Sequence, residues 1–324
     1  MRSDLEQEML DISVVFPYHN EAKSLLITLD LISQQTQMPS EVFLVNSSST
    51  DNSSELVDSW IAQSQHAYTT KFYNVFEGTD TPSSSKNVGI RKSRSSWIAF
   101  MDCGLLFERD WLEKQWNFLQ LNPDCEVVSG VCFLKGEGVI DSSAIAQTYG
   151  YDVKRSTVPS SVVKRSIFDQ HGLFLENRRA GYDAEWQLML RRKNIKRGIN
   201  NDVVIRYMGI NFGKTLRGIY RKSIMYATPT VAMPYYNVPY CYLTIMLILL
   251  ATIIWKPLLV PLWILAYIAL RGFYIPYKKS SGLKILRDYP SAIIMLPVLG
   301  FVIDTGRMVG IFKGFAKYHL GTSK

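Results

Sequence analysis

Short apolar runs alternate with polar turns over the first two hundred residues of the chain. Strands are expected at 11–16, 41–45, 72–76 and 97–102, because each is an apolar run of strand length that ends in polar residues. Apolar residues at helical spacing follow the first strand, and another helix is expected around 55–62. This repeated order of strand, turn and helix predicts an α/β fold with a doubly wound, mostly parallel sheet and helices on both of its faces.

The apolar pattern changes near residue 238. Residues 240–255 form a charge-free run of 16 residues, and residues 258–270 add another 13. Each run is shorter than the ~20 residues that a spanning helix normally needs, but aromatic residues at both ends would extend them as an interfacial belt. A buried core hairpin is the alternative, and it suits so long an apolar stretch less well. We therefore predict a transmembrane hairpin over 237–277 that turns at 255–257.

A third apolar run, residues 292–303, has only 12 residues and is followed by basic side chains. We expect a re-entrant or interfacial helix here, within a basic C-terminal region at 278–324, with the C-terminus on the cytoplasmic side. Asp304 and Arg307 would form an intramembrane ion pair beside a close-packing face of glycines. A snorkelling pair is the alternative.

The chain of 324 residues carries a net charge of +8. The basic excess gathers around the C-terminal apolar runs, so it indicates membrane flanks rather than binding of nucleic acid. Both flanks of the hairpin are basic, which places them on the cytoplasmic side of the inner membrane. Residues 216–224 mix apolar and basic positions, so an amphipathic interfacial helix is expected within a linker at 211–236. The soluble part would then be one domain at 1–210.

Polar residues follow the strands at one edge of the predicted sheet. Ligands of parallel sheets bind beyond the carboxyl ends of the strands, so the turns at 17–21 and 46–51 should converge there. Asp102 ends the strand at 97–102, where a carboxylate can hold a divalent cation against a phosphate; an Asp that merely caps a turn is the alternative. Lys86 lies in a serine-rich helix start at 83–89, which suits an anion, although a structural N-cap explains the serines equally well.

These motifs resemble those of family-2 glycosyltransferases of the GT-A fold. That family typically shows P-x-x-N-E, D-D-G-S-x-D, R-N-x-G and D-x-D elements in this order, followed by F-x-x-x-G-x-F and G-E-D-x-E-L elements. The matching segments here are Pro17-Tyr18-His19-Asn20-Glu21, Asn46-Ser47-Ser48-Ser49-Thr50-Asp51, Lys86-Asn87-Val88-Gly89, Asp102-Cys103-Gly104, Phe168-Asp169-Gln170-His171-Gly172-Leu173-Phe174 and Ala180-Gly181-Tyr182-Asp183-Ala184-Glu185-Trp186. Each match is weak by itself, but six in register over about 200 residues are specific.

Two departures from the family pattern concern the donor site. Asn46 and Ser47 stand where the family often has two acids, one of which usually accepts a hydrogen bond from the nucleobase; Asn46 can still accept one through its amide oxygen. Gly104 replaces the final aspartate of D-x-D, and one carboxylate holds Mg²⁺ or Mn²⁺ more weakly than two. A cation such as Lys86 would then share the neutralisation of the donor phosphates.

The resemblance implies an inverting glycosyltransferase of the hexosyltransferase type. It would move a sugar from a nucleotide-sugar donor, UDP-linked by preference, to a lipid-linked or cell-surface glycan acceptor in polysaccharide biosynthesis. The implied site consists of Asp183 as general base, Asp102 as ligand of Mg²⁺ or Mn²⁺, and Pro17, Tyr18, Asn20, Glu21, Asn46, Asp51, Lys86 and Asn87 around the nucleotide. Without the resemblance, Asp183 and Glu185 could equally be acids that favour a helix N-terminus.

Three further interpretations stay open. The basic residues around 178–197 are best read as a solvated helix face, with lipid headgroups as the alternative partner. A processive polysaccharide synthase is a second candidate function, although its Q-x-x-R-W motif is absent from the sequence. A catalytically inactive membrane-anchored assembly subunit is the third, because Ser47 and Gly104 replace acids of the family pattern.

Overall fold

The computed structural model describes residues 9–64, 69–207, 213–234, 236–280 and 282–320. The chain divides into two compact units. The first consists of Met1–Cys132 and Ser156–Met208, and the second of Phe133–Arg155 and Gly209–Lys324. Residues 133–155 thus group with the C-terminal helices, whereas the sequence placed them inside the predicted soluble domain at 1–210.

The first unit is built on a mixed sheet with the strand order β3-β2-β1-β4-β8-β6-β9-β5. Its N-terminal half is parallel throughout, as predicted, and consists of β1 (Leu10–Tyr18), β2 (Pro39–Asn46), β3 (Lys71–Phe76) and β4 (Trp97–Phe100). Strands β1, β2 and β4 are mostly apolar because they are buried on both faces, whereas β3 at the edge of the sheet is largely exposed. The predicted α/β fold is confirmed for this half of the sheet.

The other half of the sheet contains antiparallel pairs. Strand β8 (Val162–Lys164) pairs antiparallel with both β4 and β6 (Val127–Leu134). Strand β9 (Arg197–Tyr207) runs parallel to β6 and antiparallel to the two-residue β5 (Leu105–Leu106), and β7 (Val153–Ser156) pairs with β6. The prediction of a mostly parallel sheet holds for β1–β4 and for the β6–β9 pair, whereas the pairs made by β8 and β5 are antiparallel.

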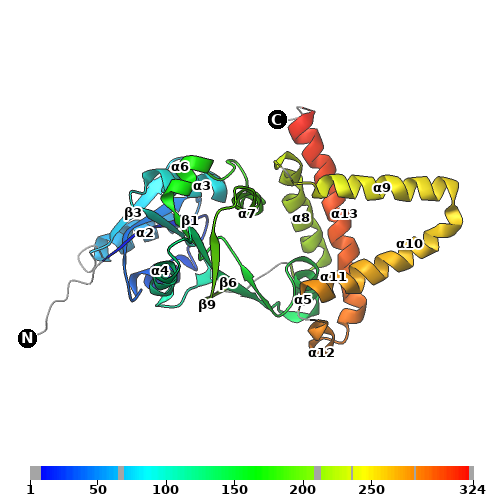
Figure 1. The fold of residues 1–324 in the computed structure, drawn as a ribbon, viewed down its shortest axis with the longest axis horizontal. Coiled ribbons are helices and arrows are strands. Elements are labelled where there is room, and N and C mark those ends of the chain that lie inside the picture. The colour runs from blue at the N-terminus through cyan, green and yellow to red at the C-terminus, as the bar shows by residue number, and fades with distance from the viewer. Residues whose placement is uncertain (1–8, 65–68, 208–212, 235, 281, 321–324) are drawn as a thin grey trace, which may run out of the picture. The chain divides into compact units, whose positions relative to one another are not determined.

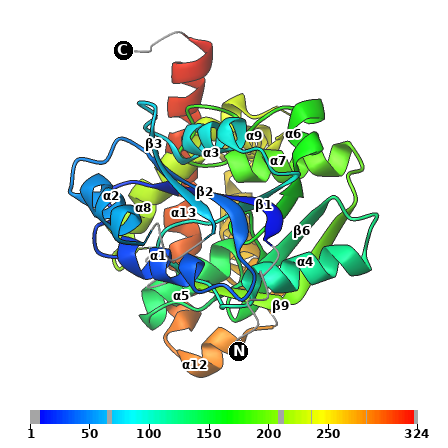
Figure 2. The same ribbon diagram turned by 90° about the vertical axis from the view of Figure 1, so that its left-hand side faces the viewer.

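Helices cover both faces of this sheet (Figure 2). One face carries α1 (Leu25–Ser33), α2 (Ser53–Ser64) and α4 (Trp111–Leu121), and the other carries α3 (Pro82–Lys92), α6 (Arg165–His171) and α7 (Tyr182–Arg192). Trp186 and Leu190 of α7 are buried in one core with Phe100 of β4 and Ile90 of α3. Helices α3 and α7 are therefore held together beside the end of β4.

The second unit is helical. Its elements are α5 (Gly138–Thr148), α8 (Leu216–Ala227), η1 (Thr228–Ala232), α9 (Val238–Trp255), η2 (Pro257–Leu259), α10 (Val260–Tyr267), η3 (Ile268–Tyr274), α11 (Ile275–Lys279), α12 (Lys284–Asp288) and α13 (Ala292–His319). Three helical segments of the described chain are long and apolar enough to cross a membrane: Val238–Trp255, Pro257–Lys279 and Ala292–His319. Figure 1 shows α9 and α10 as the arms of a hairpin, and its turn falls at the predicted position.

Helix α13 is longer than the third apolar run suggested. It has 28 residues, whereas the apolar run has 12, and it continues through Asp304 and Arg307. The predicted pair between these two residues is present at 3.6 Å, but Arg271 lies closer to Asp304, with its Nε 2.7 Å from Oδ2. Because the carboxylate is paired within the protein, the helix does not end where the charges begin.

The predicted close-packing face of α13 is confirmed. A Cβ atom on Gly310 would lie 2.6 Å from the carbonyl oxygen of Ile224 and 2.8 Å from Cβ of Ala227. Glycine is therefore required for α8 to approach α13 with its backbone. Helix α8 includes the predicted amphipathic segment, and one side of it is used in this contact.

Candidate functional site

The turns after β1 and β2 meet, as the sequence predicted. Asn20 joins them, because its Oδ1 accepts hydrogen bonds from the backbone N–H groups of Thr50 at 2.8 Å and Asp51 at 3.3 Å. Its own N–H donates to Ser49 Oγ at 3.1 Å. Asn20 has a φ of 55°, in the left-handed region that Asn tolerates better than most residues. Its side chain thus fixes the shape of the edge at which a ligand would bind.

The two carboxylates of these turns are bound within the loops. Asp51 accepts from Ser53 Oγ at 2.6 Å and from the Ser53 N–H at 3.1 Å, and these hydrogen bonds lower the pKa of Asp51. Glu21 accepts from Ser24 Oγ at 2.5 Å, and its N–H donates to Ser53 Oγ at 2.9 Å. Both acids therefore shape the loops, and both remain at the edge where the nucleotide is predicted.

Three of the predicted nucleotide-site residues are buried in strands. Tyr18 is 2% exposed, and its hydroxyl donates to Asn74 Oδ1 at 2.7 Å, so it points into the sheet. Asn46 is 5% exposed, and its Oδ1 accepts from the Ser49 N–H at 2.8 Å. Pro17 is buried within β1. These residues hold the strand ends in place, and Asn46 is the one whose amide lies at the loop.

The serine-rich start of α3 binds protein groups. Thr81 caps the helix, Ser83 Oγ donates to the Arg178 carbonyl at 2.9 Å, and Ser84 Oγ accepts from the Asn177 N–H at 3.0 Å. Asn87 is fully buried; its amide donates to the Phe174 carbonyl at 2.8 Å and its Oδ1 accepts from the Phe174 N–H at 3.0 Å. The serines are therefore better explained as a structural helix start than as an anion site. Asn87 links α3 to the segment before α7.

Lys86 and Asp102 form the centre of the site. The Lys86 ammonium donates to Asp102 Oδ1, and its nitrogen lies 5.8 Å from the centre of the Tyr182 ring. The Lys86 side chain is 0% exposed and that of Asp102 is 32% exposed. Burial acts to lower the pKa of Lys86, but the charge of Asp102 and the contact with Tyr182 outweigh it and leave that pKa raised. A permanent positive charge therefore lies beside a solvent-accessible carboxylate.

Asp183 lies in the first turn of α7, next to this pair. Desolvation by the surrounding protein and the negative charge of Asp102 raise the pKa of Asp183, while the backbone N–H groups of the helix start oppose the shift. Because the residue itself is exposed, we expect the rise to be small. Burial also raises the pKa of Glu185. Asp183 is thus an accessible carboxylate whose basicity exceeds that of an ordinary aspartate, as a general base requires.

Sequence reasoning missed Tyr182 as a site residue. Burial raises its pKa to about 12, and Lys86 acts in the opposite direction. Its ring packs on Phe174 at 5.6 Å between centroids and also faces the Lys86 ammonium. The signal in the sequence was the position of Tyr182 directly before Asp183. A motif alone does not show whether an aromatic residue at that position belongs to the site or to the core.

The residues present do not form a protein-made metal site. Asp102 stands alone after β4, since Gly104 follows where a second acid would stand, and Lys86 already neutralises it. No group of three or more His, Cys, Asp or Glu side chains converges anywhere in the described part of the chain. A divalent cation at Asp102 would share this carboxylate with Lys86 and take most of its ligands from the donor, so the observed fit is poor.

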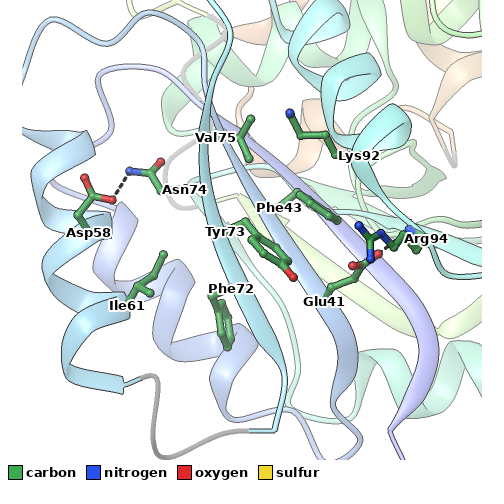
Figure 3. Close-up of a pocket in the computed structure, with 10 residues that line it drawn as sticks. All are labelled: Glu41, Phe43, Asp58, Ile61, Phe72, Tyr73, Asn74, Val75, Lys92 and Arg94. Carbon is green, nitrogen blue, oxygen red and sulfur yellow. Dashed lines mark hydrogen bonds between the residues drawn. The ribbon is translucent and has the colours of Figure 1, made fainter.

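A hollow of about 510 Å³ lies apart from these groups (Figure 3). It is lined by residues of β2, β3 and the two flanking helices, among them Phe43 and Tyr73, whose rings stack at 5.0 Å. Asn74 donates to Asp58 at 2.8 Å at its margin. None of the predicted site residues lines it, so the chemistry we consider belongs to the loop edge and not to this hollow.

Comparison with known sequences gives the relatives of this chain. The sequence profile of Glycosyl transferase family 2 matches residues 13–198. An uncharacterized glycosyltransferase of Rickettsia bellii is 26% identical over 248 residues, which cover 74% of this chain and 35% of that protein. Glycosyltransferase GlyG of Streptococcus pneumoniae is 29% identical over 119 residues, which cover 37% of this chain and 38% of that protein. The chain spans about a third of the length of its Rickettsia relatives.

Comparison with solved structures gives the fold. Mannosyltransferase PcManGT of Pyrobaculum calidifontis, solved in complex with GDP-Man and Mn²⁺, superposes with a TM-score of 0.54 at 19% sequence identity. The alignment covers 92% of this chain and 88% of that one. The likeness confirms the predicted GT-A-like fold, and at this identity it extends to the fold alone.

Proposed function

This chain belongs to glycosyl transferase family 2, and we propose that it is an inverting enzyme that moves a sugar from a nucleotide-sugar donor to a lipid-linked or cell-surface glycan acceptor. The observation that carries the proposal is the arrangement of Lys86, Asp102 and Asp183 at the carboxyl edge of the sheet. It combines a buried cation, which suits a diphosphate, with an accessible base on the adjacent helix. The mannosyltransferase PcManGT, which is similar in fold, was solved with GDP-Man bound.

In the proposed reaction Asp183 acts as the base. Its carboxylate takes the proton of an acceptor hydroxyl while the hydroxyl oxygen attacks the anomeric carbon of the donor sugar. The bond from that carbon to the phosphate oxygen breaks, and the nucleoside diphosphate leaves with the bonding electrons. Attack on the face opposite to the leaving group inverts the anomeric centre. Asp183 ends the step protonated and returns its proton to water.

Lys86 is the residue that we assign to the charge of the diphosphate. It is held by Asp102 and by the Tyr182 ring, so its ammonium is pre-positioned before the donor binds. The nucleotide would lie along the two turns, against Asn46 and the loop groups of Glu21, Asn20 and Asp51. Tyr18, Pro17 and Asn87 support these loops from beneath. The predicted Mg²⁺ or Mn²⁺ stays a prediction, and no step above depends on it.

The helical unit supports a reaction at a membrane. The two arms Val238–Trp255 and Pro257–Lys279 have mean hydropathies of 2.1 and 1.8, and only 6% and 11% of their apolar windows are buried within the protein. Such uncovered apolar helices need lipid around them. Basic residues flank the hairpin on both sides, so we propose that the catalytic unit is on the cytoplasmic side, where nucleotide sugars are available.

Nucleotide binding and turnover, measured separately, test the proposal. The full chain is purified in detergent and titrated calorimetrically with UDP, GDP and dTDP, each with Mn²⁺ and with EDTA. Transfer of radiolabelled sugar to extracted membrane lipids is measured in parallel. We expect one nucleotide to bind, and Asp183→Asn to keep that binding while it lowers transfer by about 10²–10⁴-fold. Asp183→Asn with unchanged transfer would remove Asp183 as the base.

The inactive assembly subunit remains the rival, because Gly104 and the pairing of Asp102 with Lys86 leave the predicted metal site incomplete. An inactive subunit would transfer no sugar to any lipid fraction, whether or not it binds a nucleotide. Metal-dependent binding that Asp102→Asn abolishes would support the active enzyme and place the cation. Binding that EDTA does not affect would support Lys86 as the counter-charge.

A further inference from the structure

The second unit contains a hollow of about 560 Å³ with a basic lining. One wall comes from segment 133–155 and contributes Lys154 and Arg155. The other wall is the end of the apolar segment Pro257–Lys279 and contributes Lys278 and Lys279. Four cations therefore face a space of the size that small ligands occupy, roughly 300–1,000 Å³.

The nearby acids are already paired with other cations. Asp152, the one acid in the lining, lies 3.2 Å from Lys284 Nζ. Asp288 accepts from the Tyr151 hydroxyl at 2.9 Å and lies 3.3 Å from Arg287. The hydrogen bonds to Asp288 lower its pKa, so it stays ionised and bound to these partners. These acids do not cancel the positive charge of the hollow.

Two of the four cations hold α5 in place. Lys279 Nζ donates to the carbonyl oxygens of Gln147 at 3.1 Å and Thr148 at 2.8 Å, and Arg155 Nε donates to that of Tyr149 at 2.8 Å. They cap the C-terminus of α5, where the helix dipole favours positive charge. Carbonyl groups are neutral, so these contacts add no negative charge to the hollow. Lys154 and Lys278 are exposed at the rim.

The position along the chain indicates the ligand. Lys278 and Lys279 are the last residues of a 23-residue segment that is apolar enough to cross a membrane. A hollow at the end of such a segment lies at the depth of the lipid headgroups, and basic pockets at that depth bind anionic headgroups. We propose that this hollow binds the phosphate of an anionic membrane lipid. Segment 133–155 and the end of the hairpin then contact the same lipid molecule. The site is independent of the sugar transfer proposed above.

The test uses the full chain in a neutral detergent. Binding of dioleoylphosphatidylglycerol is measured by thermal shift over a concentration series, with dioleoylphosphatidylcholine and inorganic phosphate as comparison probes. Lys154→Gln with Lys278→Gln removes two rim charges and leaves Lys279 and Arg155 on α5. We expect phosphatidylglycerol to stabilise the wild type, and its affinity to fall roughly 30-fold in the double variant. The other two probes should give no comparable stabilisation.

A matched pair of variants separates a site from general attraction. Lys313→Gln with Lys317→Gln makes the same change of charge on exposed lysines of α13, and it should leave the affinity within about twofold. Lys154→Arg with Lys278→Arg should restore binding, which excludes misfolding as the cause of the loss. Equal losses in the two glutamine variants would overturn the proposal. Stabilisation by inorganic phosphate alone, or equally by phosphatidylcholine, would overturn the assignment to an anionic lipid.

Discussion

Replacement of Lys86 by methionine is the sharpest test of the proposed centre. Methionine keeps an unbranched apolar side chain and removes the ammonium that binds Asp102. Removing one partner of a buried ion pair costs about 3–5 kcal/mol, because the other charge stays buried without compensation. Here Lys86 is 0% exposed, but the Asp102 side chain is 32% exposed and can regain water. We therefore expect the free energy of unfolding to fall by about 2 kcal/mol, below that range.

The same helix offers a matched control. Lys92 pairs with Glu77 at 2.6 Å, and these side chains are 42% and 44% exposed. Exposed pairs contribute about 0–1 kcal/mol, since solvent screens them and both side chains lose freedom. Lys92→Met removes the same charge from α3, so it measures how much the loss of a positive charge alone changes the stability. It should change stability much less than Lys86→Met does.

Thermal unfolding of the full chain in detergent, followed by intrinsic fluorescence, provides the measurement. A loss of about 2 kcal/mol should lower the Tm by roughly 4–8 °C for a unit of this size. Asp102→Asn and the double variant complete a cycle, in which the double variant should be less destabilised than the sum of the single ones. Equal Tm shifts for the Lys86 and Lys92 variants, or additive effects in the cycle, would refute the coupling on which the proposed site rests.

Three other predictions follow from single contacts. Asn87→Ala should destabilise the protein by about 2–3 kcal/mol, measured by denaturant unfolding, because both backbone groups of Phe174 lose a buried partner. Gly310→Ala should cost roughly 1–3 kcal/mol and lower the Tm in detergent, since the added methyl would lie 2.6 Å from the Ile224 carbonyl oxygen; an unchanged Tm would show that α8 moves away freely. In a pH series, transfer should fall on the acid side with an apparent pKa above that of an ordinary aspartate, because protonated Asp183 cannot accept a proton and its pKa is raised; a limb at or below the ordinary value would contradict the assignment.

The parallel half of the sheet was predictable because its signal is local. Residues 14–16 of β1 and 42–45 of β2 are uninterrupted apolar runs, since helices bury both faces of these strands. The other half offered no such signal. Strand β5 has two residues and β8 has three, and β8 is placed by antiparallel pairing with partners that are distant in sequence. Pairing of that kind is decided by contacts that no local pattern encodes.

Motif order predicted which residues lie together, but not how each side chain is bound. The turns at 17–21 and 46–51 meet as expected, and Lys86 lies beside Asp102. A motif does not say which way a side chain points, however, so Tyr18 and Asn87 were assigned to the nucleotide although both are bound inside the protein. The same limit applies to segment 133–155. Gln147 of that segment donates to the Arg271 carbonyl at 2.8 Å, across 124 residues of sequence.

The three apolar helices differ in what covers them, and this difference bears on the topology of the membrane unit. About a third of the apolar window of α13 is buried within the protein, against 6% and 11% for the hairpin arms. The covering elements are α5, whose Gln147 amide donates to the Leu296 carbonyl at 2.7 Å, and α8, which lies against Gly310.

A helix that other helices cover on one side has less apolar surface left for lipid than a bare hairpin has. By length and composition α13 can cross a membrane as a third helix, so the interfacial or re-entrant placement expected from the short apolar run stays a prediction. The carboxylate of Asp304 is consistent with this placement, because Arg271 and the hydroxyls of Tyr242 and Tyr267 all bind it from within the protein.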